Sequence, residues 1–138
     1  MDEKRILLIE DDELNRKLVK EILRVGNYRA LEAKDAETGI QMARQHKPDL
    51  ILMDIHLPKM DGLSATRLIK SDEDLKQIPI VALTALAMPE DLNKALKAGC
   101  DDYVSKPFRM QDLLKTIGQL IDSTDRGNIM GNMKDDQE

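Results

Sequence analysis

The fold of this chain is decided by residues 50–62, which read LILMDIHLPKMDG. The run 50–53 is apolar at every position, which is typical of a central strand that helices cover on both faces of a sheet. Asp54 ends this run, and Asp61-Gly62 is typical of a helix start after a short loop. The stretch therefore predicts a buried strand, a loop and a helix, with an aspartate where the strand ends.

The rest of the chain repeats this unit. Short strand-like segments at 6–9, 28–33, 80–83 and 103–104 alternate with longer segments of helical period, and only 28–33 of these carries charged residues. Asp35 is suited to cap a helix that ends before Pro48. The alternation predicts five strand–helix units, which is an α/β fold with a doubly wound parallel sheet.

Two of the predicted helices have a clear apolar face. The face of the first is closed by Gly26-Asn27, and the apolar period of the last stops after Asp122. The apolar residues are Leu14, Leu18, Val19, Ile22 and Leu23 in the first helix, and Met110, Leu113, Leu114, Ile117, Leu120 and Ile121 in the last.

The composition limits the class of protein. A chain of 138 residues predicts one domain over 1–122 and a flexible polar tail over 123–138. No apolar run approaches the ~20 residues of a transmembrane helix and no signal peptide is visible, so we expect a cytoplasmic protein without membrane partners. The net charge of −5 argues against nucleic acid as a partner. The single cysteine, Cys100, excludes an internal disulfide, and we expect it to pack in the core.

Polar residues stand where the predicted strands end. Glu10 and Asp11 follow the first strand, Asp54 the third, Thr84 the fourth and Lys106 the fifth. Open parallel sheets form their sites beyond the carboxyl ends of the strands, where the strand order reverses. Three carboxylates meeting there would repel one another unless a cation lay among them, and Mg²⁺ prefers oxygen ligands and leaves positions for phosphate oxygens. The sequence therefore predicts a Mg²⁺-dependent site for phosphate.

Four motifs in order resemble those of the receiver domains of two-component signalling, and the resemblance covers nearly all of Lys4 to Asp122. It implies the flavodoxin-like (βα)5 receiver fold with strand order 2-1-3-4-5. Residues 82–88 and 99–107 are similar to single-domain receivers of the DivK type, and receivers fused to hybrid kinases look much the same. The four motifs are 6–11 (ILLIED), 52–62 (LMDIHLPKMDG), 83–85 (LTA) and 103–107 (YVSKP).

The resemblance implies a phosphoacceptor and a set of metal ligands. Asp54 would accept the phosphoryl group and also bind Mg²⁺. Asp11 would be a direct ligand, Glu10 would act through water, and the backbone carbonyl of His56 would complete the protein ligands. Asp12 resembles the residue that follows the acid pair, and either Asp12 or Asp11 could cap the helix that begins there.

The resemblance further implies residues that respond to the phosphoryl group. Thr84 would donate a hydrogen bond to it, Lys106 would pair with it, and the peptide bond before Pro107 would be cis. Thr84 and Tyr103 would form the switch. Taken singly, Asp54 is equally a turn residue and Lys106 a solvated side chain, but four strand ends carrying the expected residue types favour the functional interpretation.

The implied partners are a histidine kinase or a histidine phosphotransfer protein upstream and a target protein downstream. We expect the target on the face made by the fourth helix, the fifth strand and the fifth helix. That face would carry Met88, Leu92, Ala95, Tyr103, Met110 and Leu114.

Two other classes of function remain open on the sequence. One is a Mg²⁺-dependent phosphatase or phosphotransferase with an aspartyl nucleophile. Enzymes of the haloacid dehalogenase type carry a second aspartate two residues after the nucleophile, where this chain has His56, and they add a cap domain. The other is an adaptor that is never phosphorylated, which the complete set of acids, threonine and lysine disfavours. We therefore expect a signalling domain whose only chemistry is its own phosphorylation and dephosphorylation.

Overall fold

In the computed structural model, residues 3–85 and 88–122 are described. Five parallel strands in this part of the chain form one sheet, in the order β2-β1-β3-β4-β5. The predicted fold class and strand order are therefore confirmed, whereas the predicted tail, 123–138, lies outside the described residues. The strands are β1 (Arg5–Ile9), β2 (Arg29–Ala33), β3 (Leu50–Asp54), β4 (Ile80–Thr84) and β5 (Asp102–Ser105).

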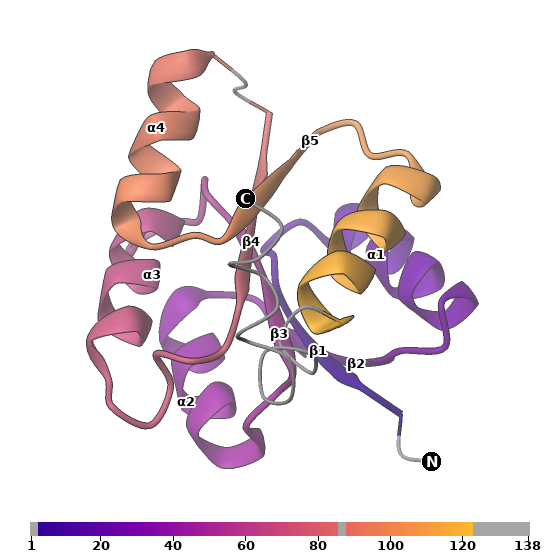
Figure 1. Cartoon of the computed structure of the whole chain (residues 1–138), viewed down its shortest axis with the longest axis horizontal. Coiled ribbons are helices and arrows are strands. Elements are labelled where there is room, and N and C mark those ends of the chain that lie inside the picture. Colours follow the sequence, from indigo (N-terminus) through magenta and orange to yellow (C-terminus); the bar gives the residue numbers. More distant parts are fainter. Residues whose placement is uncertain (1–2, 86–87, 123–138) are drawn as a thin grey trace, which may run out of the picture.

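Helices cover both faces of the sheet, as Figure 1 shows. α1 and a C-terminal helix over 110–122 lie on one face, and α2, α3 and α4 lie on the other. β3 lies between β1 and β4 in the middle of the sheet, and all five of its residues are buried. The bounds of the labelled helices are α1 (Glu13–Val25), α2 (Ala36–His46), α3 (Gly62–Ser71) and α4 (Pro89–Ala98).

Alternate side chains of the strands belong to two separate apolar cores, one on each face of the sheet. On the first face, Leu52 and its neighbours pack against Val19, Ile22 and Leu23 of α1 and against Ile117 of the C-terminal helix. On the second face, the alternate residues of the same strands pack against α2, α3 and α4, and buried Cys100 belongs to this core as predicted. Because β3 is apolar on both sides, it joins the two cores and fixes the position of Asp54 at its end.

Three helices begin at an aspartate that caps them. The carboxylates of Asp12, Asp35 and Asp61 accept hydrogen bonds from the backbone N–H groups of Asn15, Thr38 and Ser64 at 3.0, 2.8 and 2.8 Å. These bonds satisfy N–H groups that have no partner within the helix, and a cap of this kind contributes about 1 kcal/mol. The helix starts predicted at Asp35 and Asp61 are thus confirmed, and Asp12 caps α1.

Some apolar residues do not lie where the sequence pattern suggested. Leu14 and Leu18 share a stripe with the buried residues of α1, but they are 75% and 47% exposed. Ala95, expected on the outer face of α4, is 3% exposed and belongs to the second core. The second strand begins at Arg29, one residue later than predicted, and Tyr28 packs beside the first core instead.

Candidate functional site

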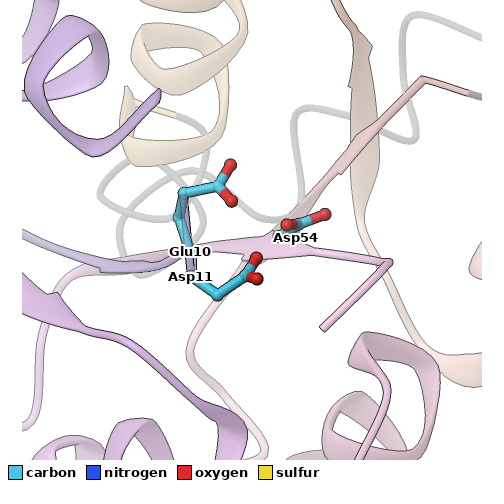
Figure 2. Close-up of side chains that lie close together, drawn as sticks. All are labelled: Glu10, Asp11 and Asp54. Carbon is cyan, nitrogen blue, oxygen red and sulfur yellow. The ribbon is translucent and has the colours of Figure 1, made fainter. Parts of the chain in front are cut away.

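Strand register brings three acidic residues to the carboxyl end of the sheet. Ile9 of β1 pairs with Met53 of β3, so Glu10 and Asp54 follow at the same level of the sheet. The backbone N–H of Glu10 donates to the carbonyl of Ala33 at 3.0 Å and continues the ladder for one residue. Figure 2 shows the carboxylates of Glu10, Asp11 and Asp54 gathered around one small space.

The three carboxylates are close enough to share one cation. One oxygen from each of Glu10, Asp11 and Asp54 lies within 4.8 Å of the other two. Glu10 is 0% exposed and Asp54 is 2% exposed, whereas Asp11 lies at the surface. Two buried carboxylates beside an exposed one leave a surplus of negative charge that opens to solvent on one side, which fits a hard divalent ion with oxygen ligands.

Lys106 is the cation that holds the two buried acids in this structure. Its Nζ lies 3.0 Å from Oε1 of Glu10 and 3.5 Å from Oδ1 of Asp54. These contacts outweigh partial burial and raise the pKa of Lys106, so the lysine remains charged. Burial together with the neighbouring Asp54 raises the pKa of Glu10 from 4.5 to about 7, although Lys106 and the N–H of Asp12 act in the opposite direction. One lysine therefore does not fully compensate two buried carboxylates.

Backbone contacts fix the orientation of Asp54. Its Oδ1 accepts a hydrogen bond from the N–H of His56 at 3.0 Å, and the N–H of Ile55 donates to the carbonyl of Leu83 on β4 at 3.0 Å. The side chain of His56 itself is exposed. The carboxylate is thus held at the end of the strand with one oxygen already engaged by the chain that follows it.

Gly62 is a further residue of the site that the sequence pattern did not assign beyond its place at a helix start. Its N–H donates to the carbonyl of Ile55 at 3.0 Å. A Cβ at this position would lie 2.2 Å from the carbonyl oxygen of Asp54 and 2.8 Å from the Cα of Ile55. Only a residue without a side chain allows α3 to begin this close to Asp54.

Thr84 lies on β4, which pairs with β3, and Tyr103 lies on β5, which pairs with β4 at the edge of the sheet. Thr84 ends β4, is 4% exposed, and stands one residue beyond the pairing of Leu83 with Asp54. Beside it is a cavity of about 40 Å³, also lined by His56 and by Leu92 and Ala95 of α4. Tyr103 on β5 is partly buried against the second core. Thr84 thus lies on the strand beside Asp54 and lines a cavity that residues of α4 also line.

The chain turns after β5 as the resemblance implied. The N–H of Lys106 donates to the carbonyl of Thr84 at 2.8 Å, and the bond between Lys106 and Pro107 is cis.

None of the helices in the described ranges 3–85 and 88–122 has the length and apolar character needed to span a bilayer.

Comparison with known proteins identifies the family of the fold and site. Residues 6–118 match the response regulator receiver domain. The chain belongs to this family, the receiver domains of two-component systems. The predicted resemblance is therefore confirmed at the level of the family.

Relatives of known name and structure agree with this assignment. The polar-differentiation response regulators DivK of Brucella anthropi and Brucella ovis are 39% and 40% identical over 114 residues, which is 83% of this chain and 93% of theirs. The crystal structure of the receiver domain of a sensor histidine kinase from Pseudomonas aeruginosa, with a magnesium ion coordinated in its active site cleft, is 38% identical with a TM-score of 0.83 and covers 88% of this chain and 100% of that one. A putative response regulator from Chloroflexus aurantiacus has a TM-score of 0.84 at 26% identity, over 87% of this chain and 98% of that one.

Proposed function

We propose that this protein is a single-domain response regulator that accepts a phosphoryl group on Asp54 and signals by protein–protein interaction. The observation that carries the proposal is the position of Asp54. It is almost fully buried among Glu10, Asp11 and Lys106, with its Oδ1 3.5 Å from the lysine Nζ. A carboxylate placed between a metal-binding acid pair and a fixed cation is suited to covalent phosphoryl transfer.

The chemistry requires an in-line nucleophile and stabilisation of charge on the transferred group. An oxygen of Asp54 forms a bond to phosphorus as the bond from phosphorus to the donor nitrogen breaks, and the donor histidine leaves with that electron pair. Lys106 would move from the acids to the new phosphoryl oxygens, and Thr84 would donate its hydroxyl to one of them. Positioning and electrostatics supply most of the rate, because the protein has little covalent chemistry to perform.

The residues present fit a magnesium ion. Asp11, Asp54 and the backbone carbonyl of His56 would hold Mg²⁺ directly, and Glu10 would hold it through water. When bound, the ion neutralises the acid cluster and stabilises charge on the phosphoryl oxygens. The domain that performs this function would extend over 1–122, with 123–138 as an accessory tail.

The phosphosite is tested with a small phosphodonor. Incubated with acetyl phosphate and Mg²⁺, the protein should gain one phosphoryl group that hydroxylamine removes, and Asp54→Asn should abolish the gain in intact-mass spectra. Asp35→Asn is a matched control, because asparagine caps helices as well as aspartate does and position 35 lies outside the acid cluster. Label that persists in Asp54→Asn would place the phosphosite elsewhere.

The same experiment separates the receiver from an enzyme. A receiver takes up one equivalent and releases it slowly, whereas a phosphatase turns over many equivalents of a phosphomonoester at fixed protein concentration. We expect a single equivalent. The upstream donor would be a histidine kinase or a histidine phosphotransfer protein, and transfer from each purified kinase of the source organism in turn would identify it by the fastest labelling.

A further inference from the structure

Arg16 makes an unusual pair of contacts with the backbone of the acid pair. Its Nη1 donates to the carbonyl oxygen of Glu10 at 3.0 Å and to that of Asp11 at 3.0 Å. The side chain is only 11% exposed, although it lies in the first turn and a half of α1. A single nitrogen thus binds the carbonyls of two consecutive residues, both of which carry a carboxylate of the cluster.

The geometry of these contacts bears on where the two carboxylates point. In an extended strand, successive side chains point to opposite faces, and successive carbonyls point in opposite directions. Such a strand would direct only one of Glu10 and Asp11 toward Asp54. Because one nitrogen lies 3.0 Å from both carbonyl oxygens, these carbonyls point to the same side, and the chain has left the strand conformation after Glu10, which still continues the ladder. This turn is what allows both carboxylates to reach the same space.

Arg16 is itself held in place from β2. Its Nε lies 3.6 Å from Oε1 of Glu32, and Oε2 of Glu32 lies 3.0 Å from Nζ of Lys20. Glu32 pairs with Leu8 in the register of β2 and β1, two residues before Glu10. The guanidinium therefore connects the acid pair to the neighbouring strand, and Glu32 balances its charge.

We propose that Arg16 is a positioning residue for the metal-binding acid pair, which it holds in the turned conformation that directs both carboxylates to Asp54. The inference rests on the proposed function, since it concerns the same site. α1 has other contacts that stabilise it, because Asp12 caps the helix and Val19, Ile22 and Leu23 are buried. Arg16 contacts neither a reacting atom nor a metal ligand atom, so it acts through the backbone of Glu10 and Asp11.

The inference predicts a loss of magnesium affinity that follows the number of contacts removed. Arg16→Met keeps an unbranched side chain that replaces the apolar stem of arginine and removes both hydrogen bonds, and we expect the dissociation constant for Mg²⁺ to rise about 10- to 100-fold, as when supporting contacts of metal ligands are lost. Arg16→Lys keeps a donor and should recover part of the affinity. Glu32→Gln removes the balancing charge and should raise the constant about threefold. Arg24→Met, on the exposed side of the same helix, should leave it unchanged.

A second measurement needs no metal. The N–H of Asp12 donates to Oε2 of Glu10 at 3.2 Å, so it reports the conformation of the acid pair. In metal-free protein, NMR should show a changed shift and faster exchange of the Asp12 amide in Arg16→Met but not in Arg24→Met.

If wild-type protein binds no Mg²⁺, the proposed function fails. If wild-type protein binds Mg²⁺ and folded Arg16→Met binds it equally well with an unchanged Asp12 amide, Arg16 does not position the pair. Should Arg16→Met not fold, the same comparison in Arg16→Lys and Glu32→Gln decides, and wild-type affinity in both overturns the inference.

Discussion

Glu10 is the residue at which burial and function oppose each other most directly. It is fully buried next to Asp54, and this environment raises its pKa to about 7, with Lys106 as its cationic partner. A metal ion would need the ionised form, and ionisation is what burial disfavours. The residue therefore links the protonation state of the acid cluster to its capacity for Mg²⁺.

The raised pKa predicts how magnesium binding depends on pH. The folded protein holds the Glu10 proton more tightly than the unfolded chain, so this group contributes stability below pH 4.5 that is lost as the pH rises through about 7. A Mg²⁺ ion held beside Glu10 would favour the ionised carboxylate, so binding should release the same proton. Apparent affinity for Mg²⁺ should therefore fall by up to about tenfold per pH unit below 7.

Titrations of Mg²⁺ followed by NMR or calorimetry at about pH 6 and about pH 8 measure this dependence. Glu10→Gln is the control, because it has no proton to lose and should flatten the profile whatever its absolute affinity. Equal slopes in the two proteins would show that another group governs the pH dependence.

Gly62 carries a second prediction at the scale of one residue. An alanine in a helix is ordinarily more stable than glycine by about 1 kcal/mol. At position 62 the new Cβ would meet backbone atoms of Asp54 and Ile55, so Gly62→Ala should instead lower the free energy of unfolding by about 1–3 kcal/mol and slow phosphorylation of Asp54.

Gly118 in the C-terminal helix provides a matched control. The nearest atom to its added Cβ is the Tyr28 hydroxyl oxygen at 3.9 Å, an ordinary contact. Gly118→Ala should therefore stabilise the protein by up to about 1 kcal/mol. Denaturant unfolding of both variants and phosphorylation with acetyl phosphate test the pair, and equal gains in stability would show that α3 tolerates a side chain beside Asp54.

At the scale of elements, the sequence predicted most of the strands and the site at their ends. β3 was predicted correctly, because an apolar run with no polar face is typical of a central strand covered on both sides by helices. Leu14 and Leu18 were predicted less well. The apolar stripe of α1 is wider than the strip of sheet that it covers, so Val19, Ile22 and Leu23 are buried and the first two residues are not. Periodicity shows which side of a helix is apolar, but it does not show how much of that side the sheet covers.

The supporting residues of the site were not predictable in the same way. Glu10, Asp11, Asp54 and Lys106 were assigned because their chemical types match their places at strand ends. Gly62 is required by a close approach of α3 to β3, and Arg16 by contacts across a turn. Such requirements arise only from the packed arrangement of elements, and nothing in the local sequence marks them.

The cavity beside Thr84 leads to a prediction about α4. A volume of about 40 Å³ has room for roughly one water molecule, so it does not admit the ring of Tyr103 as it stands. If Thr84 moves toward a phosphoryl group on Asp54 and Tyr103 follows it, Leu92 and Ala95 on the cavity wall must shift, and α4 with them. We therefore propose the face of α4, β5 and the C-terminal helix as the output surface. Met88 and Met110 are exposed on it, at 57% and 43%.

Amide shifts in NMR spectra before and after phosphorylation test this proposal. Residues of α4 and β5 should shift strongly, and α2, on the same side of the sheet but away from the cavity, serves as the internal reference. Thr84→Ala should reduce the shifts in α4 more than it reduces phosphorylation of Asp54. Shifts confined to α1 would place the output elsewhere.

At the scale of the whole molecule, the unbalanced negative charge of the acid cluster lowers the free energy of unfolding, and the same charge provides the ligands for a metal ion. Lys106 faces both Glu10 and Asp54, and Asp11 adds a third carboxylate at the surface. A ligand that binds only the folded state stabilises it by about 2.7 kcal/mol at 100 times its dissociation constant. Mg²⁺ should therefore raise the melting temperature of this protein, whereas removal of metal by a chelator should lower it.

Removing one negative charge from the cluster should stabilise the protein when Mg²⁺ is absent but not when it is bound. Asp54→Asn keeps an oxygen that can accept the bond from the N–H of His56 and leaves Lys106 paired with Glu10 alone. Without Mg²⁺ at about pH 8, we expect the free energy of unfolding of the variant to exceed that of wild type by about 1–2 kcal/mol, because one lysine now balances one buried carboxylate. Addition of Mg²⁺ should narrow or reverse this difference, since wild type gains binding energy and the variant has lost a ligand. Denaturant unfolding of both proteins, with Mg²⁺ and with a chelator, measures all four free energies. A variant less stable than wild type under both conditions would mean that Asp54 supports the fold through contacts other than its charge.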